Sequence, residues 1–432
     1  MKKAACEPPF LFYISRLEWW PSLHAIASGM IKKIPIEQLI PGMYIHDLNC
    51  GWMDHPFVSN RFTVKDEVVA LELRSIGVHE LYIDTGKGLD IAEAPTEEEV
   101  SYEIEEQILY LAKGEQAPLA AVTLAEEAHR ARKLHGEANR IVKDIITDVR
   151  LGKQIEMEKV EPLVENMVNS IFRQQDALLP LARLKSHDQY TFQHSVSVCA
   201  LMIAFARGLK MSREIIKEIA IGALLHDVGK ARVPDEILNK PAKLTDAEFT
   251  KMKSHVVQSI IILQNTPGIS QIVLDVAGQH HERFDGTGYP NKLKGDEISL
   301  YGQMGAIVDV YDAITSERVY HKGMAPTEAL RKLLEWSKFH FSPDMVQTFI
   351  RTLGIYPSGS LVRLLSGRLG VVMEQHAGKM LQPLVKVFYH AGKQYYLPPE
   401  EIDLARPDCQ DKIVSHESFE KWGIDPAKWL PV

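Results

Sequence analysis

The sequence of 432 residues has little cysteine, no long apolar run and no excess of positive charge. Its four cysteines (Cys6, Cys50, Cys199 and Cys409) are scattered without a C-x-x-C pair, which excludes a disulfide framework and favours a reducing cytoplasm. No apolar run approaches the roughly 20 residues that span a bilayer. The net charge of −8 argues against a protein that coats a nucleic-acid polymer. We therefore expect a cytoplasmic protein without a membrane or nucleic-acid polymer as partner.

The first 29 residues faintly imitate a secretory signal, because Lys2 and Lys3 precede the apolar residues 10–14. Arg16 and Glu18 interrupt that apolar stretch, and Met30 opens a sequence typical of a normal protein start. We expect residues 1–29 to be a poorly structured extension and Met30 to be a candidate for the true start.

The fold class expected is mainly α, with a helical domain between two smaller units. Residues 30–95 have the short, glycine-punctuated apolar stretches of a small α+β domain. The glutamate-rich residues 93–107 favour a solvated linker, and residues 96–150 are expected to form an acidic linker and connecting helices. Apolar residues recur every three or four positions from about residue 121 to 178, and further amphipathic helices are expected at 215–225, 246–263, 269–279 and 302–314, so residues 151–356 favour a helical domain. Residues 357–432 favour a β-rich extension, with strands at 361–365, 370–373, 384–389 and 394–397 and a hairpin turn at 391–393.

Histidines and aspartates at the ends or centres of apolar helices predict a metal site. His226 and Asp227 end the apolar run 219–225, and Asp309 interrupts another, which is costly unless a cation or hydrogen bonds satisfy them. Nitrogen and carboxylate ligands without thiolates suit iron, manganese, nickel or zinc. Seven candidates exceed the needs of one ion and favour a two-metal centre. They are His194, His226, Asp227, His255, His280, His281 and Asp309.

Several segments resemble, in order, the HD-GYP branch of the HD phosphohydrolase superfamily. The matching segments are His226–Lys230 (HDVGK), His280–Arg283 (HHER), Asp285–Pro290 (DGTGYP), Asp309–Ala313 (DVYDA) and Ser316–Tyr320 (SERVY). The resemblance covers about residues 180–350, so residues 151–356 are expected to form the catalytic domain of a helical, metal-dependent phosphohydrolase. Residues 31–100 are similar to a DUF3391-like N-terminal domain.

The resemblance implies a phosphodiesterase that converts cyclic di-GMP to pGpG, and on to GMP, in bacterial signalling that controls motility and biofilm formation. By position, one metal would be held by His194, His226, Asp227 and Asp309, and the other by His255, His280 and His281 with Asp227 bridging. Asp227 and Lys230 would act in catalysis, and Lys230, Tyr289 and Arg318 would contact the substrate. The metals would be two divalent ions, with iron or manganese preferred over nickel or zinc.

One position departs from the family pattern. Some relatives have a glutamate one helical turn before the first histidine that helps to bind a third metal, whereas this chain has Tyr190 there. We therefore expect a binuclear centre. Asp312 is equally consistent with a partner of a metal ligand and with a helix-capping or surface acid.

Alternative functions remain open. The substrate could be another nucleotide, such as cyclic GMP-AMP or an alarmone, although the Gly-Tyr-Pro turn favours cyclic dinucleotides. A catalytically weak nucleotide-binding interaction module is a different class, against which the complete set of seven ligands argues. GGDEF-type signalling proteins are candidate partners by family analogy, and a homodimer is a further option.

Overall fold

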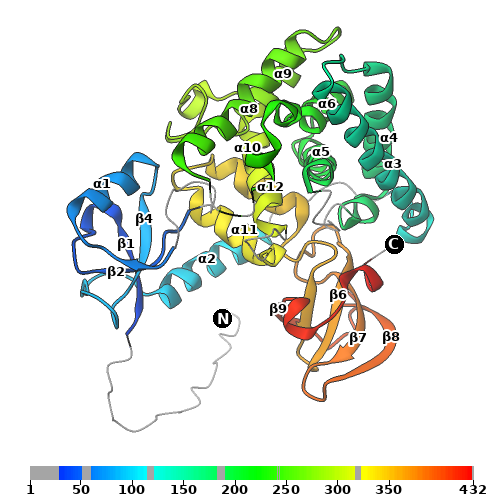
Figure 1. The fold of residues 1–432 in the computed structure, drawn as a ribbon. Coiled ribbons are helices and arrows are strands. Elements are labelled where there is room, and N and C mark those ends of the chain that lie inside the picture. The colour runs from blue at the N-terminus through cyan, green and yellow to red at the C-terminus, as the bar shows by residue number, and fades with distance from the viewer. Residues whose placement is uncertain are drawn as a thin grey trace, which may run out of the picture.

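The computed structural model describes residues 29–50, 60–113, 121–181, 190–240, 242, 244–316 and 323–430. Figure 1 shows three parts: a small sheet domain in blue, a large helical domain in green and yellow, and a second sheet in orange and red. The mainly helical fold class with a smaller unit on each side is thereby confirmed.

The N-terminal sheet has the order β1-β4-β2-β3 and is antiparallel throughout. Its elements are β1 (Ile31–Pro35), a 3-10 turn (Ile36–Gln38), β2 (Tyr44–Asp47), β3 (Phe62–Thr63), α1 (Glu67–Ser75) and β4 (Glu80–Asp84). Strand and helix side chains such as Ile34, Leu73 and Leu81 are fully buried against one another. This packing gives the small domain a core of its own.

Much of the acidic segment is helix α2 (Glu97–Leu111) rather than the solvated linker that its charge favoured. Thr96 and Glu99 form a capping box, in which the Thr96 amide donates to the Glu99 carboxylate at 2.8 Å. Val100, Ile108 and Leu111 are buried, and α2 packs against β1 and α11 (Pro326–Trp336). The glutamates therefore mark only the exposed face of this helix.

Helix α5 (Tyr190–Gly208) lies at the centre of the helical domain and packs against α3, α4, α6, α10 and α12. The other helices are α3 (Leu124–Arg150), α4 (Met157–Leu178), α6 (Arg213–Leu225), α7 (Asp235–Leu238), α8 (Asp246–Gln264), α9 (Gln271–Gln279), α10 (Leu300–Thr315) and α12 (Pro343–Leu353), with 3-10 turns at Val228–Arg232 and Gly295–Glu297. The four helices expected from periodicity are α6, α8, α9 and α10.

Hydroxyl side chains set where those four helices begin. Ser212, Thr245, Ser270 and Ser299 are the N-caps of α6, α8, α9 and α10, and each accepts a hydrogen bond from a backbone amide of the first turn. Such caps satisfy amides that have no partner within the helix. They therefore determine the register in which each helix presents its histidine or aspartate.

The C-terminal sheet has the order β8-β7-β6-β5-β9, again antiparallel. Its strands are β5 (Leu361–Leu364), β6 (Arg368–Glu374), β7 (Leu384–His390), β8 (Tyr395–Asp403) and β9 (Ile413–Glu417), followed by 3-10 turns at Glu420–Trp422 and Pro426–Lys428. The first four strands agree with the sequence expectation, whereas β9 was not expected. In the described part of the chain, no helix combines the length and the apolar character needed to cross a bilayer.

Candidate metal centre

The seven candidate ligands converge from five helices. His194 comes from α5, His226 and Asp227 follow α6, His255 lies in α8, His280 and His281 follow α9, and Asp309 lies in α10. Two groups have ligand atoms within 4.8 Å of one another, namely His194, His226 and Asp227, and His255, His280 and His281. Asp227 joins the groups, because its Oδ2 lies 3.3 Å from His226 Nε2 and its Oδ1 lies 3.3 Å from His255 Nε2.

Three histidines are held in one tautomer by the backbone. The Nδ1 atoms of His226, His255 and His280 donate to carbonyl oxygens three residues earlier, at 2.7, 2.7 and 2.9 Å. A proton on Nδ1 leaves Nε2 with a free lone pair. At the ends of α6 and α9 these bonds also use helix carbonyls that have no other helical partner. Local helix geometry thus aims three lone pairs at the same space.

His194 is held by a side chain instead. Its Nδ1 lies 2.6 Å from Asp312 Oδ2, and its Nε2 lies 2.9 Å from Asp309 Oδ1. Asp312 follows Asp309 by three positions on α10, so one helical face presents both carboxylates to the same imidazole. Asp312 therefore lies behind His194 as its hydrogen-bond partner, which decides between the two interpretations that the sequence left open.

Burial and neighbouring charges shift the pKa values of the histidines and of Asp227 in this cluster. Burial lowers the pKa of His255 to about 4 and that of His280 to about 3, so both imidazoles are neutral near pH 7. Burial alone would raise the pKa of Asp227, but the Lys230 ammonium and the His226 imidazole lower it well below its usual range. The neutral imidazoles of His255 and His280 and the ionised carboxylate of Asp227 are in the protonation states that metal binding requires, whereas the pKa of His226, which burial would lower, is raised by the Asp227 carboxylate beside it.

The residues fit a divalent metal by an independent criterion. The Nε2 atoms of His226, His255 and His280 and the Oδ1 atom of Asp227 are buried without a hydrogen-bond partner in the structure. Leaving buried polar atoms unsatisfied costs roughly 1–3 kcal/mol each. Four such atoms that face one another are costly in protein alone, and cations coordinated by them would satisfy them together.

Lys230 and Asp227 are brought together by a tight turn. The Lys230 ammonium pairs with Asp227 Oδ2, and the 3-10 turn Val228–Arg232 packs directly on α8. A side chain at Gly229 would collide with the backbone of His255 and Ser259, while its own amide donates to Ser259 Oγ at 2.9 Å. Glycine is needed for this close approach, which keeps Lys230 within reach of the cluster.

The turn after the histidine pair places Tyr289 at the edge of the cluster. Its ring lies 4.7 Å from that of His281, and its amide donates to the His281 carbonyl at 3.1 Å. Lys253, two residues before His255, has its ammonium 5.6 Å from the Tyr289 ring. The sequence reasoning did not identify Lys253, and its position two residues before a candidate ligand on the same helix was the only available signal.

Three sequence expectations fall on parts of the chain that the structure does not describe. The extension expected at residues 1–29 lies outside the described residues except for residue 29, Arg318 lies outside them, and so does the side chain of Tyr190, which bears on a third metal. All three remain predictions. Of the other nine candidate site residues, all lie in or beside the cluster described above.

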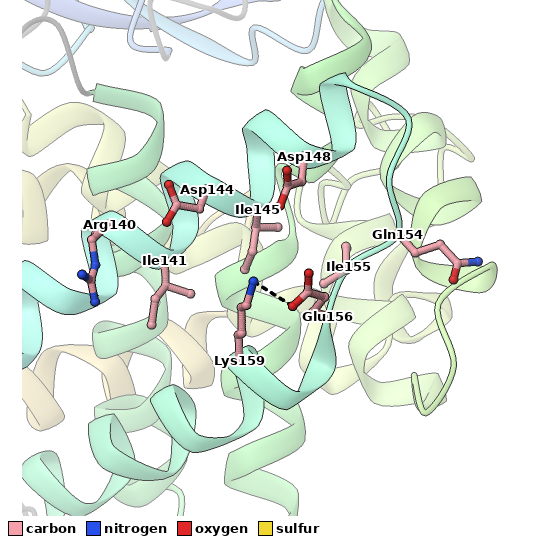
Figure 2. Close-up of a pocket in the computed structure, with 9 residues that line it drawn as sticks. All are labelled: Arg140, Ile141, Asp144, Ile145, Asp148, Gln154, Ile155, Glu156 and Lys159. Atoms are coloured by element: carbon pink, nitrogen blue, oxygen red, sulfur yellow. Dashed lines mark ion pairs between the residues drawn. The ribbon is translucent and has the colours of Figure 1, made fainter.

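A separate hollow of about 250 Å³ lies between α3 and the start of α4, away from the histidines. Figure 2 shows its lining, in which Lys159 pairs with Glu156 at 2.7 Å. Ligand pockets usually have volumes of roughly 300–1,000 Å³. This hollow contains none of the candidate site residues and is small for a dinucleotide.

Comparisons with known proteins bear on both halves of the chain. A family model described as HD domain matches residues 179–345, and one described as a domain of unknown function (DUF3391) matches residues 31–160. The chain is 44% identical over 396 residues to a cyclic di-GMP phosphodiesterase of Pseudomonas aeruginosa. The aligned residues cover 91% of this chain and 94% of that relative.

More distant similarities are partial. A 3'3'-cGAMP-specific phosphodiesterase of Vibrio cholerae is 33% identical over 200 residues, which are 44% of this chain and 46% of the relative. Among solved structures, an HDG"Y"P protein of Bdellovibrio bacteriovorus has a TM-score of 0.44 at 18% identity and covers 74% of this chain and 98% of its own.

Proposed function

The chain belongs to the HD-GYP family of HD domain phosphohydrolases, with a DUF3391 region before the catalytic domain, and we propose that it hydrolyses cyclic di-GMP to pGpG and on to GMP. The observation that carries this proposal is the pair of histidine and aspartate groups joined by Asp227, with their buried and unsatisfied ligand atoms. The relative that matches most of the chain supports the substrate.

We assign His194, His226, Asp227 and Asp309 to one metal, and His255, His280 and His281 with the bridging Asp227 to the other. The grouping of ligand atoms and the free Nε2 lone pairs support this assignment. Two divalent ions, with iron or manganese preferred, would supply Lewis-acid stabilisation of the phosphate and lower the pKa of a water molecule when bound.

We propose that Lys230 stabilises the negative charge and donates a proton at the reacting phosphate. Hydrolysis joins a water oxygen to phosphorus and breaks one P–O bond, and the leaving 3′ oxygen must gain a proton. The Lys230 ammonium lies beside the central Asp227 carboxylate and carries three donors, so it can stabilise the phosphate oxygens and protonate the leaving oxygen. Asp227 holds that ammonium in place.

Substrate contacts are assigned to the edge of the cluster. The half-buried Tyr289 ring offers a surface for stacking on a guanine base, and Lys253 places a positive charge beside that ring. Arg318 is proposed as a further substrate contact, because its planar guanidinium suits a phosphate or a guanine edge. A cyclic GMP-AMP substrate is the second candidate, supported by the similarity to the Vibrio cholerae enzyme.

Cyclic dinucleotide signalling would place the protein in the cytoplasm, in agreement with its scattered cysteines. GGDEF-type proteins and a second copy of the chain are the partners included in this proposal. Both could be tested by co-purification and by measuring the mass in solution.

The test is product chromatography after incubation of the metal-loaded protein with cyclic di-GMP or cyclic GMP-AMP, with metal analysis of the same sample. Wild type should produce pGpG and GMP, whereas the double variant His226→Ala, Asp227→Ala should have less metal and no product. If the metal-loaded wild type cleaves neither dinucleotide, the proposal is wrong. Faster cleavage of cyclic GMP-AMP than of cyclic di-GMP would identify cyclic GMP-AMP as the preferred substrate.

A further inference from the structure

The N-terminal domain touches the substrate loop directly. His79, the residue before β4, has its Nε2 atom 2.6 Å from Asp285 Oδ2, in the turn that leads to Tyr289. These residues are 206 positions apart in the chain. The His79 ring also stacks on Phe339 at 4.3 Å with an interplanar angle of 14°, so its orientation is restricted.

Asp285 serves the domain contact and the turn at the same time. Its other oxygen, Oδ1, accepts hydrogen bonds from the amide and hydroxyl of Thr287 at 2.9 and 2.7 Å. Burial raises the pKa of Asp285, but the bonds from Thr287 and His79 lower it below its ordinary value. The carboxylate is therefore an ionised acceptor, and His79 Nε2 donates to it.

The Gly77 backbone lies close to the Thr287 side chain beside this bond. Gly77 has a φ of +84°, and a Cβ at that position would lie 2.6 Å from Thr287 Oγ1. The Gly77 carbonyl accepts a hydrogen bond from His340 Nε2 at 3.1 Å, and the His340 carbonyl accepts one from the Phe284 amide at 3.0 Å. Residues 77–79 thus contact the turn directly at Asp285 and Thr287, and indirectly at Phe284 through His340.

The contact continues to the metal centre through the loop. Buried Glu282 accepts hydrogen bonds from the amides of Asn291 and Leu293, at 2.7 and 3.0 Å, which closes the far side of the loop. Between these anchors, the Tyr289 ring lies on His281. Asp285 and Thr287 are therefore the points at which the N-terminal domain contacts the turn before Tyr289.

His79, Asp285 and His340 are close enough to suggest a third metal group. However, His340 Nε2 donates to the Gly77 carbonyl and His79 Nε2 donates to Asp285, so both nitrogens carry protons in this arrangement. A nitrogen that carries a proton cannot bind a metal. The geometry therefore favours a mechanical contact.

We propose that His79 is a positioning residue through which the N-terminal domain holds the Tyr289 loop in the shape that binds the cyclic dinucleotide. This inference rests on the proposed function for its substrate, although the effect on the loop can be measured without any substrate. It gives the DUF3391 region a defined role, because any displacement of that domain would release Asp285 and loosen the loop.

The test compares His79→Ala and His79→Gln with wild type, and uses His376→Ala as the matched control. His376 makes a similar histidine–aspartate pair with Asp403 at 2.8 Å, but in the C-terminal sheet. The first measurement is hydrogen–deuterium exchange of peptides spanning residues 282–296 in the metal-loaded protein without substrate. His79→Ala should accelerate exchange there about fivefold or more, whereas His376→Ala should not.

The second measurement is the steady-state kinetics of cyclic di-GMP hydrolysis. Loss of one hydrogen bond that holds the loop should raise KM about fivefold to tenfold and leave kcat within about twofold. His79→Gln retains a donor and should recover at least part of the change. Unfolding midpoints of all variants serve as the folding control.

The outcomes separate the two proposals. Unchanged exchange in His79→Ala would overturn the positioning role, whatever the activity of wild type. Altered exchange with an unchanged KM would also overturn it, since the loop shape would then not govern binding. Altered exchange in a protein whose wild type does not cleave cyclic di-GMP would refute the proposed function and leave the positioning of the loop supported.

Discussion

Replacement of Asp312 by asparagine should weaken metal binding without removing any proposed ligand. Asp312 Oδ2 lies 2.6 Å from His194 Nδ1, and the two side chains are only 4% and 2% exposed, so water cannot substitute for the carboxylate. His226, His255 and His280 use backbone carbonyls for the same purpose, which no substitution can remove. His194 is therefore the histidine of this group whose support can be changed by a single side-chain substitution.

The magnitude follows from the charge that is lost. A carboxylate behind a metal-binding imidazole orients the ring and makes Nε2 more basic, and loss of such a partner typically lowers metal affinity about 10- to 100-fold. That range corresponds to about 1.4–2.7 kcal/mol. It agrees with the roughly 1.5–3 kcal/mol expected for a hydrogen bond to a charged group. Asp312→Ala should have a larger effect, because it also removes the acceptor.

The assay is a competition titration of Mn²⁺ or Zn²⁺ against a chromogenic chelator, accompanied by urea unfolding of the metal-free protein. Asp403→Asn is the matched control, since it changes the same kind of pair with His376 where neither residue is near the metal centre. If Asp312→Asn binds metal within twofold of wild type, Asp312 does not support His194 in the way proposed. A loss of affinity equal to that of Asp403→Asn would refute the reasoning in the same way.

Three further predictions concern single residues. Lys230→Ala should lower kcat about 100-fold or more while metal content is retained, because a general acid typically contributes about 10²–10⁴-fold. Single-turnover kinetics with metal analysis of the same sample would measure this loss. A kcat within threefold of wild type would exclude Lys230 as the general acid. Burial raises the pKa of Asp176 to about 6, so this carboxyl keeps its proton in the folded protein at pH values where the unfolded chain has lost it. The folded protein should therefore lose about 3 kcal/mol of stability as the pH rises from about 4 to 6. Asp176→Asn should remove that pH dependence from urea unfolding measured at both pH values, and an unchanged slope would contradict it. Glu335→Ala should destabilise the protein by about 3 kcal/mol, because the buried ammonium of Lys33, 2.8 Å away, loses a carboxylate partner. Calorimetry should then show a lower unfolding temperature. An unchanged unfolding temperature would mean that Glu80, which lies 2.6 Å from the same ammonium, is a sufficient partner for Lys33.

Periodicity was enough to locate four of the five helices that hold the proposed ligands, namely α6, α8, α9 and α10. Each of these four follows a serine or threonine N-cap, which is a local property, whereas α5, which carries His194, was not among the predicted ranges. Charge alone led to the wrong prediction of a solvated linker at α2, because the glutamates of this helix lie mostly on its exposed face. Its buried face is formed by Val100, Ile108 and Leu111. Strand β9 was missed because its position depends on pairing with β5, which is distant in sequence.

The amino-acid sequence by itself determined which chemical groups this protein possesses and in what order its family segments occur. Imidazoles and carboxylates at helix ends are properties of residue type and local register, so the residue order alone identifies the seven candidate ligands. The tertiary structure decided which of them face one another, that Asp312 supports His194, and that His79 reaches Asp285. These contacts join residues 118 and 206 positions apart. The physical reason is that such contacts depend on how helices and domains pack, which no local pattern specifies.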